Sequence, residues 1–168
     1  EYILMGSSLG GTMSYEIARQ LIKLGKNVKY VVMFDSWAVF SNHFKDERIF
    51  QAIMEDQIQY DLTTKNFGEL VDYEMLGNAR WRLMQLLLNY QPERGNVNIY
   101  LYKATILDKN HSTIGEYNDN GWQQYTDMKI NVYKIMGDHN TIHIEPGLSE
   151  IVRSLNSILN KSEESMIK

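Results

Sequence analysis

The feature that most limits the fold of this chain is the segment Gly6–Gly10, which matches the pattern Gly-x-Ser-x-Gly. A short apolar run, Tyr2–Met5, precedes it, and apolar residues at helical spacing follow over Thr12–Leu24. Strand, sharp turn and helix are the context in which a serine on a strained turn projects its hydroxyl above a sheet. We therefore predict that Ser8 is a nucleophile, next to helix N–H groups that favour negative charge.

Small residues are expected around such a turn. Gly6, Gly10 and Gly11 supply them and would let the helix pack close to the strand, while Gly25 stands where the helix end favours a positive φ. The same pattern also arises by chance as a glycine-rich turn before an amphipathic helix. A catalytic Ser8 requires an acid and then a histidine later in the chain.

Length and composition indicate one globular domain over residues 1–168, because the chain has 168 residues and is 43% hydrophobic. A net charge of −4, without a block of like charge, argues against a nucleic-acid partner. Without cysteines the chain has neither disulfides nor a thiolate metal site. It has no apolar run of membrane-spanning length and no visible signal peptide, so we predict no membrane partner and a cytoplasmic location.

Strand patterns recur along the chain. Asn27–Phe34 is a nearly continuous apolar run, typical of a parallel strand covered on both faces, and Asn96–Lys103 and Lys129–Met136 also read as strands. A helix is predicted from Glu145 to Asn160. The alternation of strands and helices predicts an α/β fold with a mostly parallel sheet.

Residues 39–92 interrupt this alternation, and Asp46–Tyr60 and Phe67–Tyr90 read as helices. One interpretation is an ordinary helical pair that covers the sheet. The interpretation we favour is a helical lid insertion above the serine, with methionine and aromatic side chains that form an adaptable wall.

Two aspartates are candidates for the acid. Asp35 directly follows the second predicted strand, and Asp108 follows the third. Binding groups gather beyond the carboxyl ends of parallel strands, so either could approach Ser8. On the residues alone the choice stays open.

His139 is the strongest candidate for the base, because it follows a strand and a glycine on a loop that can reach Ser8. His143 is a weaker candidate, close to the last helix, and His43 and His111 read as surface residues. No glutamate stands between His139 and His143 as in the zinc motif His-Glu-x-x-His, so we predict no metal site.

The predicted chemistry is nucleophilic. His139 takes the proton of Ser8, the acid orients the imidazole, and the N–H of Leu9 donates one hydrogen bond to the oxyanion. The second donor is expected from a loop upstream of Glu1. Losing one such donor costs about 100- to 1000-fold in rate, so we expect this chain alone to be nearly or wholly inactive.

Five stretches together resemble the thioesterase domains of non-ribosomal peptide and polyketide synthetases. They are Met5–Leu21, Val31–Ser36, Asn98–Ala104, Gly121–Thr126 and Val132–His139. The likeness covers nearly the whole chain apart from the insertion. It implies the α/β-hydrolase fold with a helical lid.

The resemblance also implies roles. The acid becomes Asp35, with Asp108 as the alternative. An acyl or peptidyl chain would arrive as a thioester on the phosphopantetheine arm of a carrier domain, so the chain itself would need no cofactor. Ser8 would accept the acyl group, and water or an internal nucleophile would release it. A generic esterase or lipase, a stand-alone editing thioesterase and a non-catalytic docking module are the alternatives.

Domains of this family have several strands before the strand–turn–helix segment that carries the serine, here called the elbow. This sequence begins at Glu1, almost inside a strand. We therefore expect an N-terminally incomplete domain whose first strand lies at a sheet edge. An apolar edge invites pairing, either with an upstream segment or with a second copy as an edge-strand dimer.

Overall fold

The computed structural model describes residues 1–38, 55, 73–106 and 117–164. The chain divides into two compact units. The first joins Glu1–Ala38 with Glu93–Lys168, and the second is Val39–Pro92. The carboxyl ends of the predicted strands, where functional groups were expected, belong to the first unit.

The second unit has the bounds predicted for the insertion. Its described helix, α3 (Tyr73–Asn89), falls within the helix predicted over Phe67–Tyr90. The helix predicted over Asp46–Tyr60 lies outside the described residues apart from residue 55, which is helical. The lid role of the insertion stays a prediction.

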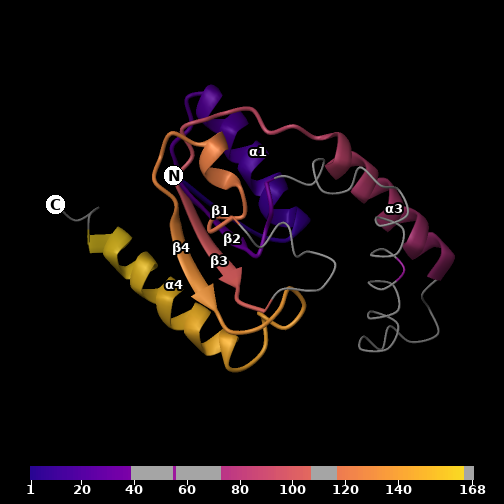
Figure 1. Ribbon diagram of the computed structural model, residues 1–168. Helices are drawn as coiled ribbons and strands as arrows, with labels where there is room; N and C mark the ends of the chain where they lie inside the picture. The colour runs from indigo at the N-terminus through magenta and orange to yellow at the C-terminus, as the bar shows by residue number, and fades with distance from the viewer. Residues whose placement is uncertain (39–54, 56–72, 107–116, 165–168) are drawn as a thin grey trace. The chain divides into compact units, whose positions relative to one another are not determined.

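A four-stranded parallel sheet forms the centre of the first unit (Figure 1). Its strands are β1 (Tyr2–Ser7), β2 (Val28–Phe34), β3 (Ile99–Ala104) and β4 (Asn131–Ile135), in the spatial order β1-β2-β3-β4. Each neighbouring pair is parallel. All four carboxyl ends therefore meet at one edge of the sheet, where α/β folds place their sites.

Helices α1 (Leu9–Lys23) and α4 (Gly147–Glu164) cover the two faces of this sheet (Figure 1). The segment Tyr30–Met33 of β2 is at most 3% exposed, which confirms a strand buried on both faces. On the α4 side, Ile151 belongs to a buried cluster with residues of β2, β3 and β4. Fully burying one such large apolar side chain stabilises the fold by roughly 1.5–3 kcal/mol. Among the described helices, none is both long enough and apolar enough to cross a bilayer.

The first strand, β1, lies at one edge of the sheet formed by the described residues, as predicted. Its apolar side chains Tyr2, Ile3 and Met5 are 44%, 36% and 47% exposed. Pairing of this edge, with an upstream segment or with a second copy, stays a prediction.

The end of α1 follows its sequence signal. Gly25 has a φ of 70°, and its N–H donates to the Ile22 carbonyl at 2.9 Å. The N–H of Lys26 donates to the Leu21 carbonyl, also at 2.9 Å. These bonds satisfy carbonyls of the last turn and confirm the predicted left-handed cap.

The segment between β3 and β4 contains a short helix that the sequence patterns above did not indicate. This is η3 (Trp122–Tyr125), a 3₁₀ helix. Asp119 accepts hydrogen bonds from the N–H groups of its first turn, and Trp122 is fully buried. The buried Trp122 side chain fixes this turn. The sequence did not indicate it because most of the neighbouring residues are polar.

Tyr15 connects α1 to η3 and gives a first testable expectation. Its buried hydroxyl lies 2.5 Å from the Tyr125 carbonyl and 2.9 Å from the Glu93 carbonyl, and burial raises the pKa of Tyr15 to about 12. An unfolded tyrosine titrates at about 10, so the native phenol adds stability below that pH that is lost as the pH rises toward 12. We expect Tyr15→Phe to lower the free energy of unfolding by about 1–3 kcal/mol at neutral pH. In the variant, this free energy should also fall less steeply as the pH rises above about 10.

Urea unfolding of wild type and Tyr15→Phe at a series of pH values between neutrality and about pH 11 measures both effects. Tyr2→Phe, which alters an exposed tyrosine on β1, is the matched control. If the free energy of unfolding falls equally steeply with rising pH in wild type and Tyr15→Phe, the role assigned to the Tyr15 hydroxyl is wrong.

Candidate active site

The turn between β1 and α1 is strained at Ser8, as predicted. Ser8 has φ 51° and ψ −122°, a region that residues other than glycine rarely adopt. Its carbonyl accepts the Ser36 hydroxyl at 2.6 Å and the Gly11 N–H at 3.1 Å. These bonds hold the serine in a conformation that costs energy, which is a common property of functional positions.

Close packing explains two of the three glycines around this turn. A Cβ on Gly6 would lie 2.1 Å from the Gly10 carbonyl group, and a Cβ on Gly11 would lie 1.9 Å from Ser36 Oγ. At Gly10 the expectation was wrong, because a Cβ there would meet nothing within 4 Å among the described atoms. The close approach of helix to strand therefore depends on Gly6 and Gly11.

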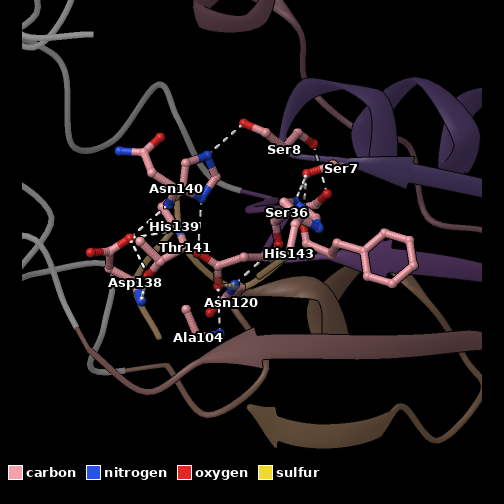
Figure 2. A network of polar contacts seen from close by, with 12 residues as sticks. Ser7, Ser8, Ser36, Ala104, Asn120, Asp138, His139, Asn140, Thr141 and His143 are labelled. Carbon is pink, nitrogen blue, oxygen red and sulfur yellow. Dashed lines mark hydrogen bonds and ion pairs between the residues drawn. The ribbon is translucent and has the colours of Figure 1, made fainter. Parts of the chain in front are cut away.

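Three side chains from three strand ends meet at the carboxyl edge of the sheet. Ser8 Oγ lies 3.0 Å from His139 Nε2, and His139 Nδ1 lies 2.8 Å from Asp35 Oδ2. Figure 2 shows Ser8 and His139 facing each other across this edge, joined by a dashed line. The structure thus brings together the three residues that the sequence singled out.

Asp35 is buried and fully hydrogen-bonded. Its Oδ1 accepts the Ala104 N–H at 3.1 Å and the Asn120 side-chain amide at 3.3 Å. Burial alone would raise the pKa of Asp35, but the hydrogen bond and charge of His139, with the bonds from Ala104 and Asn120, hold that pKa below its usual value. The carboxyl is therefore ionised at neutral pH and accepts hydrogen bonds through both oxygens.

The ionised carboxylate decides which ring nitrogen of His139 carries the proton. Because Asp35 can accept but not donate, Nδ1 donates to it. In the neutral ring, Nε2 then accepts the Ser8 hydroxyl. The indole of Trp37 stacks on the imidazole with ring centres 4.6 Å apart and limits rotation of the ring.

The loop that carries His139 is ordered by its own residues. Asp138 Oδ1 accepts the N–H groups of Asn140 at 2.9 Å and Thr141 at 2.8 Å, and also the Thr141 hydroxyl at 2.8 Å (Figure 2). Gly137, with a φ of 130°, lets the chain leave β4 and enter this turn. Backbone geometry therefore aims the imidazole toward Ser8.

Sequence reasoning missed Asn120 and the role of Ser36. The Asn120 side chain is 2% exposed and also donates to the Ser36 carbonyl at 3.2 Å, which accepts the Trp122 indole N–H at 2.9 Å as well. Asn120 has a φ of 51°, and asparagine before glycine is a turn signal in the sequence. That signal could mark the turn but not its contact with Asp35, 85 residues away.

The remaining candidates have different outcomes. Leu9 is the first residue of α1, where backbone N–H groups have no partner within the helix. His143 contacts Ser7 rather than Ser8, and partial burial and then the positive charge of His139 lower the pKa of His143. Asp108, His43 and His111 lie outside the described residues.

Comparison with known proteins identifies the family. A family model described as "Thioesterase domain" matches residues 1–159. Malpibaldin synthetase of Mortierella alpina is 26% identical over 174 residues, which cover 96% of this chain and 3% of the synthetase. A mycosubtilin synthase polypeptide of Bacillus subtilis is 23% identical over 167 residues, which cover 99% of this chain and 6% of that polypeptide. The chain thus spans a small part of these relatives.

Solved structures show the same fold. The thioesterase domain that cyclises the lipopeptide antibiotic surfactin has a TM-score of 0.73 at 17% identity, over 94% of this chain and 67% of that domain's chain. A four-domain nonribosomal peptide synthetase bound to AMP and glycine has a TM-score of 0.73 at 18% identity, over 94% of this chain and 14% of the synthetase. The predicted α/β-hydrolase fold is confirmed. This chain therefore belongs to the family of thioesterase domains.

Proposed function

We propose that this chain releases an acyl or peptidyl chain from the phosphopantetheine thioester of a carrier domain, through an acyl intermediate on Ser8. The observation that carries the proposal is the continuous series of hydrogen bonds from Ser8 Oγ through His139 to Asp35. This is the geometry that activates a serine for acyl transfer. Membership of the thioesterase family supports a thioester as the substrate.

Acylation follows from the positions of the groups. As Ser8 Oγ attacks the thioester carbonyl carbon, His139 Nε2 takes its proton, and Asp35 stabilises the positive imidazole through Nδ1–H. The N–H of Leu9 donates to the oxyanion of the tetrahedral intermediate. The C–S bond then breaks, and the proton on Nε2 passes to the departing pantetheine sulfur.

Release uses the same groups in reverse. Water, or a hydroxyl or amine of the bound chain itself, loses its proton to His139 as it attacks the acyl carbon. The bond between that carbon and Ser8 Oγ breaks, and His139 returns the proton to the serine. Attack by water gives a free acid, whereas attack by the chain's own nucleophile gives a macrocycle.

The partner in this proposal is a carrier domain. Support comes from the synthetases among the relatives and from the solved four-domain synthetase that shares the fold. The phosphopantetheine arm belongs to the carrier, so this chain would hold no cofactor of its own. We also propose that residues 39–92 act as the lid that shields the acyl-enzyme from water.

Two measurements on the full-length protein test the proposal. A fluorophosphonate probe should attach to one serine, and mass spectrometry should place the adduct on Ser8. Turnover of an acyl-pantetheine thioester should exceed that of the matching oxygen ester, whereas a generic esterase or lipase would accept both. Absence of the adduct would leave a non-catalytic docking module, and an adduct on another serine would reject Ser8 as the nucleophile.

A further inference from the structure

A second serine–histidine contact lies beside the one described above. His143 Nε2 is 2.9 Å from Ser7 Oγ, and the His143 ring packs edge-on against Phe34 with ring centres 5.7 Å apart and planes at 70°. Figure 2 shows Ser7 and His143 next to each other, on the side of the elbow away from Asp138. The proposed mechanism does not use this pair.

The partners of His143 have a particular place in the chain. Ser7 is the last residue of β1 and precedes Ser8, and Phe34 is the last residue of β2 and precedes Asp35. The two strand ends are also joined to each other, because the Ser8 N–H donates to the Phe34 carbonyl at 3.0 Å. His143 therefore contacts the residue before the nucleophile and the residue before the acid.

The segment Gly137–Ile144, here called the histidine turn, connects His139 to His143. Within it, the Ile142 N–H donates to the Asp138 carbonyl at 2.9 Å, and the Ile142 side chain is fully buried. Together with the bonds to Asp138 Oδ1, these contacts make one ordered turn. The two histidine rings therefore belong to one short hydrogen-bonded segment.

We propose that His143 and Ser7 position His139, which rests on the function proposed above. The histidine turn is attached at one end to Asp35 and Ser8 through His139. At its other end, the Ser7–His143 contact attaches it to β1 and the ring contact of His143 with Phe34 attaches it to β2. These contacts fix the distance between the His139 imidazole and the Ser8 hydroxyl. Both residues are positioning residues, because they act through His139.

A double-mutant cycle tests this role. The rate constant for fluorophosphonate labelling of Ser8 reports the Ser8–His139 contact directly and needs no natural substrate. Ser7→Ala removes the hydroxyl, and His143→Phe keeps a ring against Phe34 but removes Nε2. Misplacement of a catalytic group by about 1 Å can cost 100-fold, so a partial displacement should slow labelling about 10-fold in each variant. The double variant should be about as slow as the slower single variant, because both substitutions remove the same Ser7–His143 contact.

Controls separate positioning from loss of fold. Ser149→Ala removes a comparable surface hydrogen bond, that from Ser149 Oγ to Glu145 Oε1 at 2.7 Å, and should leave labelling unchanged. His143→Gln keeps a side-chain amide in reach of Ser7 and should restore most of the rate. With a natural thioester substrate, Ser7→Ala should lower kcat while KM stays near the wild-type value.

A second readout covers variants that fold poorly. The proton on His139 Nδ1, bonded to Asp35, should give a separate far-downfield NMR signal, and His143→Phe should broaden it by loosening the turn. Unchanged labelling in both single variants, or a double variant slowed by the product of the two effects, would overturn the positioning role. Failure of wild-type Ser8 to react would instead reject the proposed function, and this inference with it.

Discussion

Replacing Ser8 by alanine should lower kcat for thioester release by about a million-fold, because the group that forms the acyl intermediate is lost. His139 and Asp35 then have no hydroxyl to activate. Residual turnover should reflect the oxyanion donors and substrate binding, which alone give about 10³- to 10⁴-fold over water. Ser8 Oγ contacts His139 at the edge of the sheet rather than in the buried core, so we expect the substitution to change the melting temperature little.

Single-turnover measurement of thiol release from an acyl-pantetheine substrate, made on the full-length protein, checks this prediction. Ser157→Ala, an exposed serine on α4, is the matched control and should keep wild-type activity. A Ser8→Ala variant that keeps more than about 1% of wild-type kcat would show that another group is the nucleophile.

The second large effect is expected at Asp35. Asp35→Asn places an amide where the carboxylate accepts His139 Nδ1–H, and an amide that donates to Nδ1 moves the ring proton to Nε2. Nε2 can then no longer accept the Ser8 proton, so kcat should fall about 10⁴-fold. Asp127→Asn, which alters an exposed ion pair with Arg94, is the control.

The pH dependence of the same variant follows from the lowered pKa of Asp35. A carboxyl whose pKa is lower in the native state adds stability above its unfolded pKa of about 4, and this stability is lost as the pH falls through the native pKa. The difference in melting temperature between wild type and Asp35→Asn should therefore be present at neutral pH and shrink in acid. A difference that is constant down to about pH 2 would contradict the assignment.

Local signals explain what the sequence could predict. The elbow, the apolar run of β2 and the glycine after α1 are each encoded within a few residues, and the structure places all three as predicted. The sequence also predicts that three distant residues meet, namely Ser8, Asp35 and His139. Residues just beyond the carboxyl ends of parallel strands lie at the same edge of the sheet.

The contacts that support these residues were not predictable in the same way. Asn120 reaches Asp35 across 85 residues, and Trp122 reaches the Ser36 carbonyl across 86. Such bonds depend on how one loop packs against another. Neither the periodicity of apolar residues nor the spacing of motifs indicates that packing. The error at Gly10 has the same origin, since only the assembled helix and strand show which glycine lies in the contact.

The parallel sheet places Ser8 and His139 beyond the ends of different strands, far apart in the sequence. Ser8 and His139 are 131 residues apart, and the imidazole follows β4, the last strand of the described sheet. Because synthesis runs from the N-terminus, Ser8 is made long before His139. Under the function proposed above, Ser8 therefore stays unactivated until β4 and the loop after it have folded.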